Sequence, residues 1–160
     1  MRVLGYDAVR VPEELVRDGV VEPADLNELL ARADAVSLHA PLTWETRHLI
    51  GAEQLRRMKP GAYLVNTSRG GLVDPAALLR ALDEGRIAGA ALDVLEAEPP
   101  GVDDPLVAHE RVLITPCATW YSEESMEALK SGVAREVVRV LSGDRPRSPV
   151  NESTGRGPVG

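Results

Sequence analysis

The chain has 160 residues, with 44% apolar and 27% charged side chains, which fits one globular domain with a substantial buried core. Its net charge of −7 disfavours nucleic acid as a partner, because nucleic-acid binders concentrate positive charge on one face. The single cysteine, Cys117, excludes an internal disulfide framework and a multi-cysteine zinc site.

The chain carries no sequence signal for a membrane. No apolar run approaches the roughly 18–20 residues of a transmembrane helix. The first residues lack the apolar core and cleavage site of a signal peptide. We therefore expect a cytoplasmic protein with no membrane partner. No two histidines have metal-ligand spacing with a carboxylate, so we also expect no metal site.

Short aliphatic runs bounded by Gly, Pro and Asp predict buried strands. In chain order they are Val3–Tyr6, Val20–Glu22, Ala35–His39, Ala62–Asn66, Ala88–Asp93 and Val112–Thr115. Their nearly continuous apolar character favours a parallel sheet that is covered on both faces, since an antiparallel sheet with one wet face would alternate apolar and polar residues.

The intervening segments have the spacing of amphipathic helices. They are Ala24–Ala31, Gly51–Met58, Pro75–Glu84 and, longest, about Ser122–Leu141. Asp74 is the expected N-cap before Pro75, and Gly85 is the expected left-handed C-terminal cap. Repeated strand–helix alternation predicts an α/β fold, a Rossmann-like parallel sheet with helices on both faces.

Polar residues follow the predicted strands at the places where ligands bind in such sheets, beyond the carboxyl ends. These are Tyr6-Asp7, His39-Ala40-Pro41, Asn66–Arg69, Asp93 and Pro116-Cys117. This clustering predicts a binding site independently of any family.

Asp7 has two interpretations. An acidic residue at this strand end of a dinucleotide fold accepts hydrogen bonds from the ribose hydroxyls and favours NAD over NADP; it can equally cap a turn. The glycine-rich phosphate loop should lie about 20 residues earlier. Only six residues precede Asp7, and no G-x-G-x-x-G occurs in the chain. Either Asp7 is not a ribose ligand, or the chain starts after the first strand and phosphate loop.

Four segments decide between these alternatives: Ser37–Thr43 with Thr46–Ile50, Met58–Asp74, Gly89–Pro99 and Leu113–Glu123. In order and spacing they closely resemble the D-isomer-specific 2-hydroxyacid dehydrogenases. The Trp-Tyr-Ser-Glu-Glu ending is similar to the branch that includes the C-terminal-binding-protein co-repressors. The resemblance implies that residues 1–151 are a partial NAD-binding domain, N-terminally truncated, that ends in a return segment toward an absent substrate domain. We expect 152–160 to be a disordered tail.

The resemblance implies three catalytic positions. Arg69 matches the arginine that binds the substrate carboxylate, and Glu98 matches the acid that orients the catalytic histidine. Cys117 stands where that histidine belongs. A thiol with an ordinary pKa of about 8.5 is mostly protonated at pH 7, and its sulfur reaches less far than an imidazole nitrogen.

The family also implies cofactor contacts at Asp7, Ala40, Pro41, Thr46, Thr67 and Asp93, with Asp93 near the nicotinamide carboxamide. Glu96 is expected to be a solvated loop charge. None of the three histidines is an obvious substitute for the one missing at 117. We expect His39 in the cofactor segment, His48 in a polar turn and His109 in a solvated loop.

The implied function is hydride transfer between NAD and a small 2-oxo or 2-hydroxy acid. Cys117 and the truncation argue against activity of this chain alone. The alternatives are a non-catalytic, NAD-responsive binding or subunit-like module, or a decayed remnant. Without the first strand, the edges of Val3–Tyr6 and Ala35–Leu38 should lie unpaired, which favours a homodimer or a complementing upstream chain.

Overall fold

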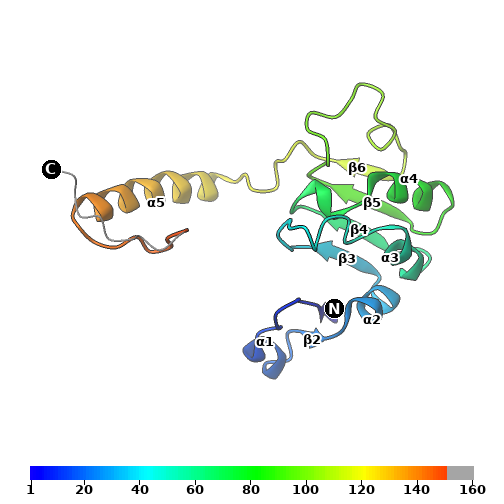
Figure 1. Ribbon diagram of the computed structural model, residues 1–160, viewed down its shortest axis with the longest axis horizontal. Helices are drawn as coiled ribbons and strands as arrows, with labels where there is room; N and C mark the ends of the chain where they lie inside the picture. Colours follow the sequence, from blue (N-terminus) through cyan, green and yellow to red (C-terminus); the bar gives the residue numbers. More distant parts are fainter. Residues whose placement is uncertain (151–160) are drawn as a thin grey trace. The chain divides into compact units, whose positions relative to one another are not determined.

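The computed structural model describes residues 1–150, which fall into two compact units, Met1–Thr119 and the part that begins at Trp120. The first unit holds six parallel strands, as predicted (Figure 1). They are β1 (Leu4–Gly5), β2 (Glu22–Pro23), β3 (Ala35–Leu38), β4 (Tyr63–Asn66), β5 (Gly89–Leu92) and β6 (Val112–Ile114). Its helices are α1 (Glu13–Arg17), α2 (Leu26–Arg32), α3 (Ala52–Arg57) and α4 (Pro75–Asp83), with a 3₁₀ turn, η1 (Gly70–Leu72).

The register of the main sheet separates its two faces. Strands pair in the order β3-β4-β5-β6, with Val36 opposite Leu64 and Leu64 opposite Ala90. These side chains are buried in one core cluster with Leu30 of α2, Leu55 of α3, and Leu78 and Leu82 of α4. Helices α2, α3 and α4 therefore cover this face. On the opposite face, Tyr63 and Leu113 are exposed.

The core predicts a contrast between two leucine-to-alanine substitutions. Leu82 is 0% exposed, so Leu82→Ala should lower the free energy of unfolding by about 2–5 kcal/mol through lost burial and a residual cavity. Leu113 is 66% exposed, and Leu113→Ala should change that free energy by less than about 0.5 kcal/mol. Urea unfolding followed by circular dichroism measures both. Equal losses would contradict the assignment of the buried face.

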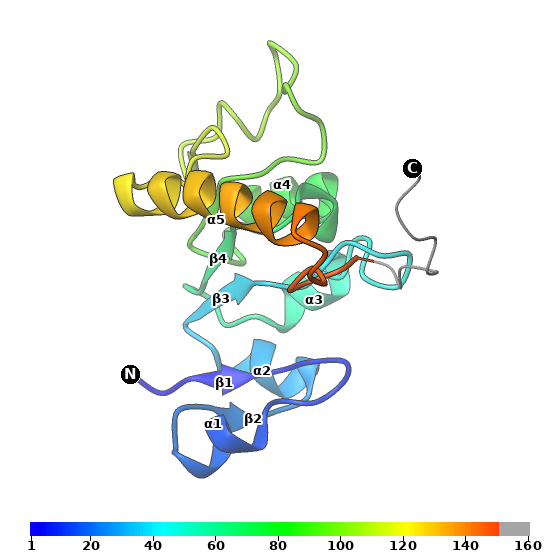
Figure 2. The same cartoon turned by 90° about the vertical axis from the view of Figure 1, so that its left-hand side faces the viewer.

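The strands form two sheets rather than one. Within residues 1–150, β1 pairs only with β2, Leu4 opposite Glu22, and β3 pairs only with β4 (Figure 2). In this described part of the chain, the edge of β1 away from β2 and the edge of β3 away from β4 have no strand partner. The two edges do not pair with each other either.

Helix ends follow the predicted capping signals. Asp74 Oδ1 accepts from the amides of Ala76 and Ala77, both at 3.0 Å, before Pro75 opens α4. Gly85 has φ +64°, the left-handed conformation expected of a C-terminal cap. Helix α1 was not predicted, because its five residues bury nothing and carry no apolar stripe.

The second unit consists of α5 (Glu123–Leu141) and the segment after it. Ser122 is its N-cap, and its hydroxyl accepts from the Ser125 amide at 3.0 Å. No residue of α5 is buried. Among the helices of the described part, none is both long and apolar enough to cross a membrane. The expected disordered tail, 152–160, lies outside the described residues.

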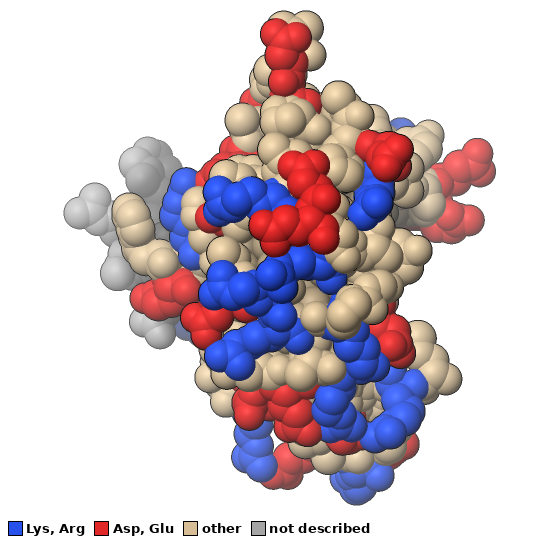
Figure 3. Space-filling view, turned by 90° about the vertical axis from the view of Figure 1, so that its right-hand side faces the viewer, with Lys and Arg blue, Asp and Glu red and all other residues tan. Residues whose placement is uncertain are grey.

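Basic and acidic side chains lie interleaved on one face of the molecule (Figure 3). Several basic residues near α3 and α4 are ion-paired: Arg57 with Glu53 at 2.7 Å, Lys59 with Asp34 at 2.9 Å and Arg86 with Glu84 at 2.8 Å. Pairs this exposed contribute little to stability.

Candidate functional site

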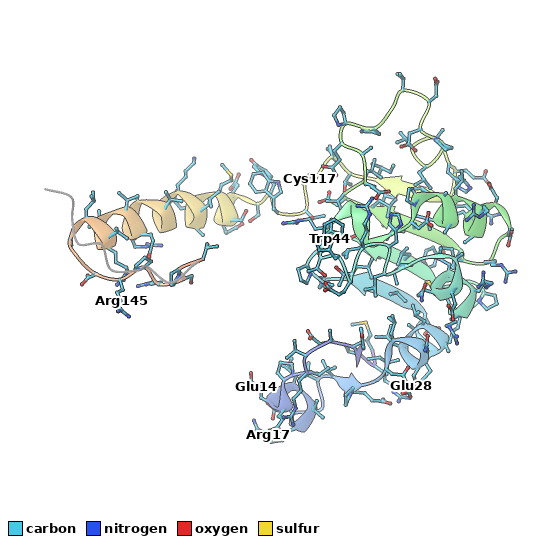
Figure 4. All side chains as sticks on the ribbon, viewed as in Figure 1. Glu14, Arg17, Glu28, Trp44, Cys117 and Arg145 are labelled. Atoms are coloured by element: carbon cyan, nitrogen blue, oxygen red, sulfur yellow. The ribbon has the colours of Figure 1, made fainter. Side chains whose placement is uncertain are left out.

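The loops after β4, β5 and β6 leave the same edge of the sheet, because the three strands are parallel neighbours. Backbone hydrogen bonds extend the ladder beyond the strands. The Asp93 amide donates to Asn66 O at 2.9 Å, and the Cys117 amide donates to Asp93 O at 3.0 Å. Figure 4 shows Cys117 at this edge, together with Trp44 from the loop after β3. The fold thus gathers the predicted site residues from separate parts of the sequence.

Arg69 lies on a turn that is stabilised by the buried side-chain amide of Asn66. Asn66, at the end of β4, is fully buried, and its Nδ2 donates to Arg69 O at 2.9 Å while its Oδ1 accepts from the Ser68 amide at 3.1 Å. The Arg69 side chain is exposed, and among residues 1–150 its guanidinium donates only from Nη1 to the neighbouring Ser68 carbonyl, at 2.7 Å. Its guanidinium therefore has donors left for a carboxylate.

Gly70 fixes the distance between the Arg69 turn and the loop after β5. A Cβ at this position would lie 2.0 Å from the Leu95 carbonyl carbon and oxygen, which no side chain can occupy. Glycine is required here by close backbone approach, and it brings η1 against the loop that carries Glu96 and Glu98.

Asp93 is buried at the end of β5, with 5% of its surface exposed. Its carboxylate accepts from the Thr115 hydroxyl, from the Thr119 hydroxyl at 2.6 Å and amide at 3.1 Å, and from the Ala118 amide at 2.8 Å. Hydrogen bonds from Thr115 first, then Thr119, hold the pKa of the Asp93 carboxyl well below its usual range. Asp93 is therefore a carboxylate throughout the neutral range.

This lowered pKa predicts a pH-dependent stability. A carboxyl whose pKa is depressed in the folded state contributes stability above its unfolded pKa, near 3.9, and loses it as the pH falls toward the folded value. Asp93→Asn should therefore be less stable than the parent chain at pH 7, and the difference should shrink at pH 3. Urea midpoints at the two pH values measure this, with Asp103→Asn in an exposed loop as the control. A difference that stays constant with pH would contradict the prediction.

Cys117 is an exposed free thiol in an unusual backbone conformation. Its φ is +52°, in the left-handed region that non-glycine residues seldom adopt, although His, Asn and Asp are enriched there. The backbone conformation at 117 is thus one that histidine, asparagine or aspartate adopts more readily than the cysteine present.

The two glutamates of the loop after β5, Glu96 and Glu98, have different hydrogen-bond partners. Glu98 is exposed, and its Oε1 accepts from the Leu95 amide at 2.8 Å, which orients the loop. Glu96 is an exposed loop residue, as expected, but it is not free of partners: its side chain pairs with Arg47 and contacts His48 Nε2 at 3.0 Å. Glu96 thereby ties the turn after β3 to the loop after β5. No hydrogen bond or ion pair joins the side chains of Arg69, Glu98 and Cys117 within residues 1–150.

The histidines have structural partners. His39 Nε2 lies 2.9 Å from the Ser37 hydroxyl, and His48 lies in the polar turn that the sequence predicts. His109 is not the solvated loop residue expected. Its side chain is largely buried, Nδ1 accepts from the Arg111 amide at 3.1 Å, and Nε2 lies 3.5 Å from Asp83.

The predicted cofactor residues lie at four strand ends, with Asp93 at the end of β5 as described above. Asp7 follows β1, exposed, with Oδ1 accepting from the Val9 amide at 2.8 Å. After β3, the Ala40 carbonyl accepts from Ser68 at 2.8 Å and the Pro41 carbonyl from the Thr46 hydroxyl at 2.7 Å. Thr67 follows β4 and is half-buried.

Two residues of this edge were missed by sequence reasoning. The sequence places Asn66 only in the polar cluster at the end of β4. Its burial and its hydrogen bond to the Arg69 carbonyl are visible only in the structure. The available sequence signal was an amide side chain at the end of a strand, just before a turn. Trp44 is 93% exposed on the loop after β3, where a large aromatic residue is unexpected unless something contacts it.

Comparison with known proteins identifies the class. The family described as "D-isomer specific 2-hydroxyacid dehydrogenase, NAD binding domain" matches residues 1–118. The chain belongs to this family, and NAD is the cofactor of the domain that it matches.

Individual relatives show the same domain. The chain is 49% identical to a glyoxylate reductase of Korarchaeum cryptofilum over 152 residues, which are 95% of this chain and 46% of that protein. It is 45% identical to a D-3-phosphoglycerate dehydrogenase of Methanocaldococcus jannaschii, covering 94% of this chain and 29% of that one. The NAD-complexed D-isomer specific 2-hydroxyacid dehydrogenase of Lactobacillus delbrueckii ssp. bulgaricus superposes with a TM-score of 0.85 at 37% identity, over 94% of this chain and 49% of the other. The chain thus spans less than half the length of these relatives.

Proposed function

We propose that this chain is the NAD-binding part of an oxidoreductase that transfers hydride between NAD(H) and a small 2-oxo or 2-hydroxy acid, and that it is not catalytically competent by itself. The observation that carries the proposal is the meeting of the Arg69, Asp93 and Cys117 segments at the carboxyl edge of the sheet. Parallel α/β sheets bind their ligands at this edge.

The exposed side chains suggest a division of labour. The free donors of Arg69 suit a planar carboxylate, gripped through two parallel hydrogen bonds. Glu98, with the residue at 117, would handle the proton of the substrate oxygen. The Cys117 thiol can donate a proton, but lacks the near-neutral titration of imidazole.

The residues of this chain fit the riboses of NAD better than they fit its pyrophosphate. Asp7 offers a carboxylate to ribose hydroxyls. Ala40, Pro41, Thr46 and Thr67 would lie along the adenosine and nicotinamide ribose, and Asp93 would lie near the nicotinamide carboxamide. NAD supplies the hydride acceptor or donor when bound. Its pyrophosphate is normally held by backbone amides of a glycine-rich loop at a helix N-terminus. No G-x-G-x-x-G motif occurs in this sequence.

The two separate sheets support a partnership with another polypeptide segment. The unpaired edges of β1 and β3 suit one added parallel strand, from an upstream segment in a complementing chain; a homodimer is the other arrangement that could cover exposed edges. We place the protein in the cytoplasm.

The second candidate function is a non-catalytic, NAD-responsive module, and Cys117 at the histidine position favours it. NADH binding without turnover would support this candidate. A turnover that depends on Arg69 would support the oxidoreductase instead.

Titration of the purified chain with NADH tests the shared part of both candidates, with the exposed Trp44 and Trp120 as fluorescence reporters. We expect a Kd of about 1 mM, since no glycine-rich loop in this sequence supplies pyrophosphate donors. Asp7→Ala should weaken the signal further, while Asp18→Ala, an exposed aspartate on the turn after α1, should not. A complete lack of signal at millimolar NADH would defeat NAD binding by this chain.

A further inference from the structure

The segment after β6 is held by one residue from the neighbouring strand. Three residues within Thr115–Thr119 donate four hydrogen bonds to the Asp93 carboxylate: one from Thr115, one from Ala118 and two from Thr119. An ionised carboxylate accepts about four hydrogen bonds, so its capacity is filled. The donors come from both sides of Cys117 and not from Cys117 itself.

The backbone of Asp93 also anchors the segment after β6. Its carbonyl accepts from the Cys117 amide at 3.0 Å, and its amide donates to Asn66 O at 2.9 Å in the next strand. The loop is thereby anchored to the core of the sheet through a buried residue. A loop residue fastened on both sides and at its own amide keeps a φ of +52°, although that conformation costs free energy for a side chain other than glycine.

We propose that Asp93 is a positioning residue, which sets the backbone conformation at 117 and hence the direction of whichever side chain stands there. The hydrogen bonds to Asp93 come from Thr115, Ala118, Thr119 and the backbone amide of residue 117. This positioning therefore does not depend on which side chain stands at 117. The importance of that direction for proton transfer rests on the proposed function; the positioning itself does not.

The proposal also changes the expectation for Asp93. A carboxylate with four donors already bound has no free acceptor site for a ligand amide. A direct contact from Asp93 to a cofactor would need one of the loop hydrogen bonds to open. Binding at this point would then be coupled to movement of residue 117.

The proposal is testable without cofactor or turnover. The 160-residue chain is alkylated with iodoacetamide, and mass spectrometry follows modification of Cys117 and amide exchange within 115–119. Thr119→Val removes one donor but keeps both the side-chain volume and the Asp93 charge. Thr119→Ser restores the hydroxyl. We expect Thr119→Val to speed amide exchange about threefold to tenfold, because one charge-assisted hydrogen bond is lost, and Thr119→Ser to return it to the parent rate. Cys117 is exposed in the parent chain, so its alkylation should stay at the parent rate in both variants.

The controls separate positioning from general loosening. Asp104→Asn removes another loop-capping carboxylate, which accepts from the Leu106 amide at 2.9 Å, and should leave amide exchange within 115–119 unaffected. Asp93→Asn should give the largest increase in exchange; if it fails to fold by circular dichroism, the Thr119 pair still decides. Parent-like exchange in Thr119→Val, or equal acceleration in Thr119→Val and Thr119→Ser, would overturn the proposal. Failure of the NADH titration would leave this result unchanged, so the two proposals fail separately.

Discussion

Replacing Cys117 by histidine should raise turnover about 10²–10⁴-fold in a chimera that joins this chain to the part of the Korarchaeum relative outside the matched region. Imidazole can give and take a proton near neutral pH, and it reaches further from the backbone than a thiol. The left-handed backbone at 117 tolerates histidine better than cysteine, so the substitution should not cost stability. NADH oxidation with glyoxylate and with hydroxypyruvate measures the effect.

Two comparisons make this experiment decisive. Cys117→Asn tests the backbone alone, because asparagine also tolerates positive φ but cannot transfer a proton as imidazole does; it should leave the rate low. In the 160-residue chain without the added segment, Cys117→His should produce no turnover. An unchanged rate in the chimera would mean that residue 117 does not stand at the proton-transfer position.

The fold was largely predictable because its signals are local. Aliphatic runs marked five strands to within one residue at each end, and Asp74 and Gly85 marked the ends of α4. The run Val20–Glu22 shares only Glu22 with β2, which is Glu22–Pro23. Helix α1 escaped because five exposed residues carry no periodic signal. The separation into two sheets followed from strand order, since β1 and β3 share a neighbour only in a complete Rossmann sheet.

The sequence predicted where the site residues lie in the fold, but not which side chains they contact. The sequence placed Asp93, Glu96 and Glu98 after one strand, but a side chain's partner depends on which loop lies opposite. Glu96 meets Arg47 and His48, 49 and 48 residues away, and Asp93 meets Thr115 and Thr119 across the next strand. No spacing rule within one segment encodes such contacts. The catalytic and cofactor roles of Arg69, Glu98 and Asp7 stay predictions until they are measured.

Supplying a strand between β1 and β3 should have the second large effect, on stability and on cofactor affinity separately. Each unpaired edge would gain backbone hydrogen bonds worth about 1 kcal/mol apiece, so the melting temperature should rise by about 10 °C. The test uses the same chimera and a version of it in which the glycine-rich loop is replaced by a serine-rich linker of equal length. Calorimetry gives the melting temperature, and NADH titration gives the Kd.

The two chimeras should agree in one measurement and differ in the other. Both should melt higher than the 160-residue chain, because both provide the strand that joins the sheets. Only the chimera with the glycine-rich loop should bind NADH about 100-fold more tightly than the linker version, because two or more charge-assisted hydrogen bonds to the pyrophosphate depend on that loop. Tight binding by both would show that the Asp7, Thr67 and Asp93 edge holds NAD without a phosphate loop. Unchanged melting in both would show that the edges of β1 and β3 do not accept a strand, and that the two sheets are stable as separate units.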